Sequence, residues 1–268
     1  MRFDLAIMAQ NSGYRRKVTP FRPIAPPSSF GEELARIYIE NVKVWDAAAP
    51  GMIATYARAY AALQHDRAPA LQSEIDAADE QTTGKDRLEK IATAVLLFMG
   101  RYERWHRMQW IEIVKRTSVD IGPFIGPNEF ATVLENAMAR NVALVKDISG
   151  EASGKISDIV FRGLQTKTPV EDVAADIQAA TGFARKRSIR VAHDQLIKVS
   201  AALDTARMMQ AGIGEFIWKH TPQKHPRLHH LARDGLVFKL GQPRGDEPGE
   251  APFCRCYRVP ILRLPQKN

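Results

Sequence analysis

The sequence has 268 residues, of which 45% are hydrophobic and 25% charged, a composition typical of a globular protein with one large domain or two smaller ones. The longest apolar run, Ala92 to Gly100, would cover only about 13 Å as a helix, far less than a bilayer needs. We therefore expect no membrane partner. Asp4 interrupts the apolar N-terminus and no cleavage pattern follows, so we also expect no secretory signal and a cytoplasmic site of synthesis.

The formal charge of +8 is concentrated in the C-terminal third of the chain. Residues 183–268 hold 16 Lys or Arg and 7 Asp or Glu, a net charge of +9, whereas the preceding 182 residues hold 22 and 23, a net charge of −1. Such a segment can contact nucleic-acid phosphate or an acidic protein surface. The alternative is a solvated basic surface with no particular partner.

Residues 1–29 are predicted to form an extended arm, because Pro20, Pro23, Pro26 and Pro27 disfavour a helix. Residues 30–127 are predicted to be helical, with a first helix that ends at Pro50-Gly51 and a long one from Lys85 to about Thr117. Trp45 is interpreted as a core anchor of the first helix.

Residues 128–212 are predicted to form a second helical region. Its helices are expected to run to about Ile148, over residues 151–164, over residues 169–180 and over residues 185–210. Thr168, Pro169 and Glu171 give the third of these a complete start signal, and Gly182 is expected to end it.

Residues 213–268 change character and predict three short strands, at residues 215–218, 236–240 and 256–261. Pro260 should place the last of these at a sheet edge or terminus. Asp234-Gly235 predicts a tight turn into the second strand, with Trp218 packed beneath it. The predicted fold class is mainly α, with a helical N-terminal and middle region and a small α+β C-terminal module.

The C-terminal module also holds residues of the types that bind metal. Histidine nitrogen and cysteine thiolate are ligands that zinc prefers, and a metal stabilises a small module. The candidate ligands are His230, Cys254 and Cys256, with His225 and His229 nearby in sequence. The C-x-C spacing is not the usual zinc knuckle, so we favour a hydrogen-bonded histidine beside two buried thiols, and no cofactor. A structural zinc stays open as the alternative.

Catalysis has little support in the sequence. His229, His230 and Asp234 beside basic residues fit a metal-dependent nuclease, but no further carboxylate cluster stands out. The loop carboxylates at 246, 247 and 250 are interpreted as solubilising. No glycine-rich nucleotide-binding motif occurs. We therefore expect a protein that is not an enzyme.

Three ordered stretches resemble the phage Mu F-like minor head proteins. The first, residues 139–195, fits the family's helical middle at Asn141, Leu144, Lys146, Asp194 and Gln195. The second, residues 212–238, and the terminal C-R-C triplet retain the family's remaining signature positions, namely Trp218, Arg227, His230, Asp234, Gly235, Phe238, Cys254, Arg255 and Cys256. The sequence departs from the pattern at His193, Ser188, His225 and Arg233.

The resemblance implies a structural component of the virion, a minor capsid protein acting in phage head morphogenesis and capsid assembly. It implies a portal-associated position, or one on the inner capsid wall. The expected partners are the portal and other head proteins, with packaged DNA an open alternative through the basic C-terminal third. The expected location is the virion head, assembled in the host cytoplasm. The alternative function is a metal-dependent nucleic-acid-binding or nuclease module.

Overall fold

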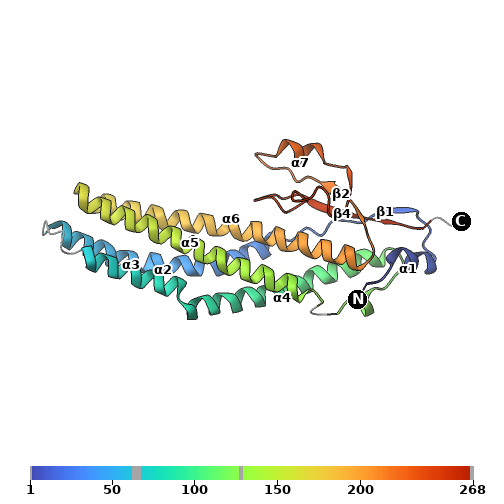
Figure 1. The fold of residues 1–268 in the computed structure, drawn as a ribbon, viewed down its shortest axis with the longest axis horizontal. Helices are drawn as coiled ribbons and strands as arrows, with labels where there is room; N and C mark the ends of the chain where they lie inside the picture. The colour runs from blue at the N-terminus through green and yellow to red at the C-terminus, as the bar shows by residue number, and fades with distance from the viewer. Residues whose placement is uncertain (1, 62–67, 127–128, 266–268) are drawn as a thin grey trace. The chain divides into compact units, whose positions relative to one another are not determined.

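The computed structural model describes residues 2–61, 68–126 and 129–265 and is mainly helical (Figure 1). Its helices are α1 (Leu5–Asn11), α2 (Ser28–Ala61), α3 (Ala68–Thr83), α4 (Lys85–Lys115), α5 (Ala131–Thr166), α6 (Val170–Gln210) and α7 (Leu228–Ala232), with a short 3-10 helix at Gly122–Phe124. Its strands are β1 (Val18–Pro20), β2 (Glu215–Lys219), β3 (Val237–Lys239) and β4 (Tyr257–Arg263). The predicted fold class is confirmed.

The chain divides into two compact units. Unit 1 contains Met1–Phe30, Phe98–Ala137 and Asp194–Asn268, and unit 2 contains Gly31–Leu97 and Met138–His193. The divisions fall inside α2, α4, α5 and α6, so each unit is assembled from segments that are distant in sequence. The four consecutive regions expected from the sequence stay a prediction, and one of their boundaries, at 127/128, lies outside the described residues.

Unit 2 is a helical bundle whose core contains specific polar contacts. The Tyr38 hydroxyl donates to Asn141 at 2.7 Å, and the Trp45 indole donates to the Ser149 hydroxyl at 2.9 Å, so both contacts join α2 to α5. The Ser149 hydroxyl in turn donates to Thr82 of α3 at 2.6 Å. Buried polar groups that are bonded in this way fix one packing register. Trp45 is fully buried, which confirms its predicted core role.

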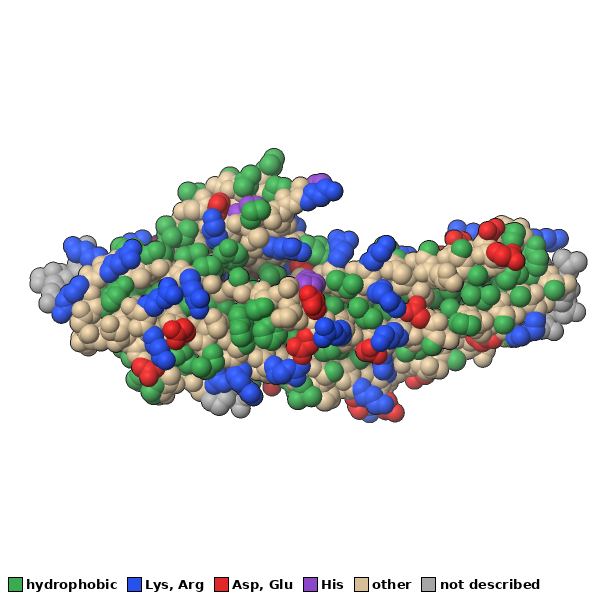
Figure 2. Space-filling model, turned by 180° about the vertical axis from the view of Figure 1, so that it is seen from behind, with side chains coloured by type: hydrophobic (Ala, Val, Ile, Leu, Met, Phe, Trp, Pro, Cys, Tyr) green, Lys and Arg blue, Asp and Glu red, His purple; other side chains and the backbone are tan. Residues whose placement is uncertain are grey.

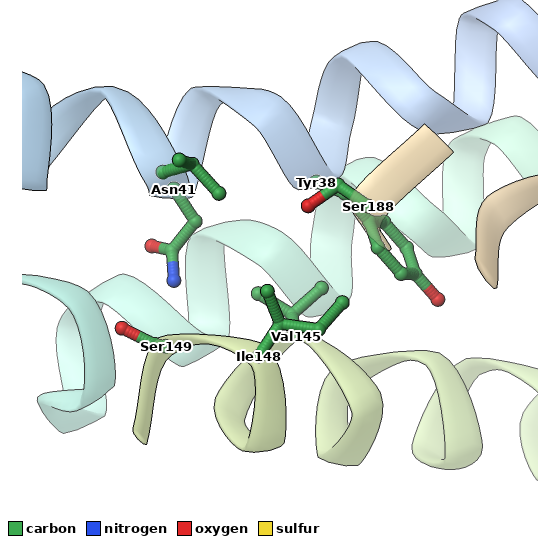
Figure 3. A pocket seen from close by; sticks show the side chains of 7 residues that line it. Tyr38, Asn41, Val145, Ile148, Ser149 and Ser188 are labelled. Carbon is green, nitrogen blue, oxygen red and sulfur yellow. The ribbon is translucent and has the colours of Figure 1, made fainter. Parts of the chain in front are cut away.

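The space between α2, α5 and α6 is closely filled. Figure 3 shows the side chains that line it, and the space does not admit a water molecule. Unit 2 therefore offers no interior binding cavity at this position. The lining residues are Tyr38, Asn41, Val42, Val145, Ile148, Ser149 and Ser188.

Unit 1 is built around an antiparallel sheet with the strand order β1-β4-β2-β3. β2 pairs with β4 through Phe216↔Pro260 and Trp218↔Arg258, among other pairs, and with β3 through Phe216↔Phe238. Phe216 and Trp218 are fully buried from one face of β2. This alternation is the one that the sequence predicted for a half-buried strand.

The predicted helix ends at Pro50-Gly51, after Ile148 and at Gly182 are wrong. α2 continues through Pro50, and α5 and α6 are each a single helix. A glycine costs a helix about 1 kcal/mol and a proline about 3 kcal/mol relative to alanine. Burial of apolar side chains on both sides of each site offsets these costs, as Trp45 and Met52 do around Pro50.

Residues 1–29 do not form a free extended arm. Leu5–Asn11 is helical, with Asp4 accepting the Ile7 backbone N–H at its N-cap, and Val18–Pro20 is the strand that pairs with β4. The prolines excluded a long helix, as expected. The apolar residues Phe21 and Ile24 between them are buried in the core of unit 1, and β1 pairs with β4.

This pairing also corrects the expected place of Pro260. β4 lies between β1 and β2, so Pro260 is in an interior strand and not at an edge. The Pro260 carbonyl accepts the Phe21 N–H at 2.8 Å, just beyond the last residue of β1. Pro260 lacks an N–H on the side of β4 that faces β1, at the point where the pairing with β1 ends. The loss of one hydrogen-bond donor there costs little.

Of the helices described, none combines the length and apolar character that crossing a membrane requires. On the face shown in Figure 2, basic side chains are interspersed with acidic and hydrophobic ones and do not merge into one basic patch.

Candidate metal centre

Three segments of unit 1 bring two histidines and two cysteines together. His220 directly follows β2, His230 lies in α7, and Cys254 and Cys256 precede β4. All four side chains are buried, with exposed fractions between 1% and 7%. The site therefore lies where the sheet, the short helix and the long turn-rich loop meet.

Backbone geometry aims both cysteines at the same side. In an extended segment residues i and i+2 share a face, and Arg255 between the two cysteines is exposed. The Cys254 N–H donates to the Ala251 carbonyl at 3.0 Å, and the Thr221 hydroxyl donates to the Arg255 carbonyl at 2.7 Å. These bonds hold the C-x-C segment against the residues that follow β2.

The ligand-type atoms lie close together. The Cys254 sulfur is 3.4 Å from His230 Nδ1, and the Cys256 sulfur is 3.6 Å from the same nitrogen. The Cys256 sulfur is also 3.5 Å from His220 Nδ1. The ligand atoms of His230, Cys254 and Cys256 all lie within 4.8 Å of one another. The structure thus brings together the three residues that the sequence singled out.

A carboxylate orients His230 from the other side of its ring. His230 Nε2 lies 2.9 Å from Asp246 Oδ1, and Arg233 donates to Asp246 Oδ2 at 2.6 Å. Burial raises the pKa of Asp246, but the bonds from Arg233 and His230 outweigh it and the pKa is lowered. Because this carboxylate is ionised, Nε2 carries the proton and Nδ1 presents its lone pair to the sulfurs.

The two thiols do not ionise independently. The pKa of Cys254 is lowered to about 5, first because the Cys256 side chain hydrogen bonds to it, then by backbone N–H groups and His230. The pKa of Cys256 is raised, first by its bond to Cys254 and then by burial. One thiolate is thus stabilised in this pocket by the neighbouring thiol.

The Asp-Gly turn has the predicted structural role. Gly235 has φ +82°, a conformation that favours glycine, and its N–H donates to the Trp218 carbonyl at 2.9 Å. Asp234 accepts the His220 backbone N–H at 2.8 Å, which lowers the pKa of Asp234. The Trp218 ring is edge-on to His230, with 5.0 Å between ring centroids. The turn therefore holds the end of β2, where His220 lies, close to His230.

The remaining signature positions have packing roles, and some reach the site. Asp194 of α6 accepts the Phe253 N–H at 2.6 Å, next to Cys254, and its other oxygen accepts from Gln195. Arg227 donates to the Pro252 carbonyl at 2.8 Å at the start of the cysteine segment. Asn141 lies in unit 2 and is bonded to Tyr38, so it belongs to the bundle core.

One residue of the site was missed from the sequence, and two acids of the adjacent loop were misread. His220 was not considered, although it lies two residues after the buried Trp218 of β2. Asp246 and Glu247 were interpreted as solubilising, yet Asp246 binds His230 and Glu247 accepts from the buried Arg258 at 2.7 Å. His225, by contrast, is exposed. The contact between His230 and Asp246 joins residues 16 positions apart, and such a separation leaves no periodic signal in the sequence.

Many basic side chains of the C-terminal third are already paired with acids. Such pairing reduces the positive potential available to a phosphate backbone. The paired residues are Arg185, Arg187, Lys198, Arg207, Lys219, Arg233, Arg258 and Arg263.

Comparison with known proteins identifies residues 154–259 as a match to the family described as phage Mu protein F like protein. The resemblance drawn from the sequence is confirmed over this range, which includes the candidate metal centre. An uncharacterised protein of Haemophilus influenzae is 29% identical over 150 residues, which is 55% of this chain and 34% of the relative. The chain thus spans about a third of the length of that relative. No solved structure matches the chain.

Proposed function

Because the chain carries a phage Mu protein F like region over residues 154–259, we propose that it is a phage head-morphogenesis protein. In this role it is a structural part of the virion head that docks on the portal or on the inner capsid wall during assembly. The family match is the observation that carries the proposal. The Haemophilus relative adds a similar sequence but no function of its own.

Exposed apolar side chains on the C-terminal module support a docking role. α7 exposes Leu228 and Leu231 one turn apart, at 79% and 48%. Leu236 and Val237, at the start of β3, are each more than half exposed, and β3 is an edge strand of the sheet. Exposed apolar residues beside a free strand edge are suited to contact with another protein.

The metal-dependent nuclease is less well supported by the geometry. His229, His230 and Asp246 form a second cluster of ligand-type atoms within 4.8 Å. The Asp246 carboxylate, however, is already neutralised by Arg233 and hydrogen-bonded to His230. A hydrolytic metal needs free carboxylate oxygens and an open coordination position. The cluster is better explained as support for His230.

Contact with packaged DNA is likewise a weaker candidate than contact with protein. Eight basic residues of the C-terminal third are paired with acids, whereas Leu228 and Leu231 of α7 are exposed apolar side chains. We therefore place a head protein, and not DNA, against this surface.

The test is complementation of a phage that lacks this chain. Wild-type chain should restore the yield of complete heads, and a Leu228→Asp/Leu231→Asp variant should restore less and be depleted from purified heads. Leu97→Asp is the matched control, because Leu97 is 61% exposed in α4 and belongs to unit 2, whereas the C-terminal module belongs to unit 1. Equal head yield and incorporation for all three chains would contradict docking through α7. Normal heads without the chain would contradict the proposed function itself.

A further inference from the structure

We propose that unit 1 binds one structural zinc ion through Cys254, Cys256, His230 and His220. The inference is independent of the role in the phage head, because it depends only on the placement of these side chains.

The three sulfur–nitrogen distances of the cluster match those of a tetrahedral zinc site. With zinc about 2.3 Å from sulfur and about 2.1 Å from nitrogen, neighbouring ligand atoms lie about 3.3–3.8 Å apart. The three sulfur–nitrogen distances, 3.4, 3.5 and 3.6 Å, all fall in this range. Two thiolates and two imidazoles are also a donor set that selects zinc over calcium or magnesium.

Thiol–imidazole hydrogen bonds explain the same cluster less completely. Each thiol has one proton to donate, and His230 Nδ1 has one lone pair to accept it. Yet His230 Nδ1 faces both sulfurs, and the Cys256 sulfur faces both ring nitrogens. A central cation satisfies all of these contacts at once, whereas hydrogen bonds satisfy only some of them.

The surroundings of His230 are those of a zinc ligand. Metal-bound histidines usually donate their second ring N–H to a carboxylate, which fixes the ring and its tautomer. Asp246 has this position at 2.9 Å from Nε2, and Arg233 holds Asp246 in turn. Nδ1 is the nitrogen that points at the sulfurs, as zinc binding requires.

His220 is the fourth ligand on geometric grounds. It lies 3.5 Å from Cys256, but it is outside the trio of residues whose ligand atoms are all within 4.8 Å of one another. Its ring therefore moves toward His230 and Cys254 when the metal binds. Its Nε2 is buried without a hydrogen-bond partner among the described residues, so the Nδ1 contact is the main polar contact of the ring.

Zinc would tie α7 to the end of β2 and to the segment before β4. The end of β2, the five-residue α7 and the segment before β4 each contribute a ligand, while α7 leaves two leucines exposed. The closed set of four protein ligands leaves no position for water, so the ion is structural and not catalytic.

The first test measures metal in the full chain, produced with zinc supplied and thiols kept reduced. Elemental analysis should find about one zinc per wild-type chain, and almost none in a Cys254→Ser/Cys256→Ser variant. His225→Gln, which alters an exposed histidine of the same module, should keep the metal. A wild-type chain without zinc, or equal zinc in the cysteine variant, would overturn the proposal.

A second measurement on the wild-type chain covers the case in which the cysteine variant fails to fold. Replacing zinc with Co²⁺ should give the thiolate charge-transfer and visible bands of a tetrahedral site. A thiol reagent should react slowly with the zinc-loaded chain and much faster after a chelator is added. Thiols that react at the same rate with and without the chelator would contradict zinc ligation.

His220→Gln tests the fourth ligand separately. This variant should lose the tetrahedral cobalt spectrum and bind zinc at least tenfold more weakly. Retention of both properties would overturn the assignment of His220. These outcomes are distinct from those of the head experiments, which measure assembly and not metal content.

Discussion

A buried ion-pair network in unit 1 gives the strongest stability prediction. Arg207 of α6 is fully buried and donates to Glu103 of α4 at 2.8 Å. Its Nε also donates to His106 Nδ1 at 3.0 Å, and His106 Nε2 lies 3.1 Å from Asp204. Because Nδ1 accepts a hydrogen bond from the guanidinium, Nε2 carries the ring proton and donates a hydrogen bond to Asp204. Burial lowers the pKa of Arg207, and Glu103 opposes this effect.

Glu103→Gln keeps the shape of the side chain but leaves Arg207 without its charged partner. Breaking a buried pair in this way costs about 3–5 kcal/mol. The amide oxygen still accepts one bond, so we expect the lower end, about 3 kcal/mol. The Arg107 guanidinium, 3.7 Å from Glu103, does not reduce this cost, because it adds a second cation with no acid opposite.

Urea or thermal unfolding followed by circular dichroism measures the effect. Asp46→Asn is the matched control, because it breaks the partly exposed pair with Arg185 and should cost less than about 1 kcal/mol. The double variant Glu103→Gln/Arg207→Met should cost less than the sum of the single variants, since it removes both charges. The reasoning is refuted if Glu103→Gln costs no more than Asp46→Asn.

Three further predictions concern the C-terminal module. Gly249→Ala places a methyl group 2.8 Å from the Ala201 Cβ and should destabilise unit 1. The loss should be about 1–3 kcal/mol greater than that of Gly245→Ala, because Gly245 has a similar positive φ but open space around it. Chemical denaturation measures both losses, and equal losses would contradict the predicted clash. Asp246→Asn should weaken zinc binding about 10- to 100-fold in a competition assay, and unchanged affinity would show that it does not support His230. The Asp234 carboxylate, whose pKa lies below its ordinary 3.8, should stabilise the fold, but solvent screens this partly exposed group, so Asp234→Asn should cost less than about 1 kcal/mol at pH 7. Because the pKa is lowered on folding, the contribution is present above pH 3.8 and is lost as the pH falls through the lower pKa of the folded state. A pH-independent difference in unfolding free energy contradicts the assignment.

The helices and strands were largely predictable because their patterns are local. Apolar residues at three- and four-residue steps indicated the helices, and the alternation around Phe216 and Trp218 indicated β2. The errors arose where a local breaking signal was weaker than tertiary packing. Pro50 and Gly182 each lie inside a helix whose buried face continues on both sides.

The sheet was only partly predictable, since its fourth strand comes from the other end of the chain. Val18–Pro20 pairs with residues 261–263, more than 240 residues away, and no local sequence pattern predicts such a pairing. The proline-rich composition of this segment suggested an extended conformation. It did not indicate that Thr19, Phe21 and Ile24 are buried.

The candidate site was predictable in its residue types but not in its full membership. His230, Cys254 and Cys256 were singled out because imidazole and thiolate are ligands that zinc prefers and because His230 fits the histidine position of the family. Asp246 reaches the site only through the loop that follows β3, and His220 only through the turn that Asp234 holds. These contacts depend on three-dimensional closure of the module, which spacing along the chain does not encode.

The central claim is that this chain is a built-in part of a phage head, and the most direct test is its copy number there. Quantitative mass spectrometry would count the chain against the major capsid protein in purified virions and in DNA-free heads. We expect a low, reproducible copy number in both, because the proposed docking on head proteins would precede DNA entry. Absence from both preparations would contradict it, and presence only in DNA-filled virions would replace protein docking with DNA binding.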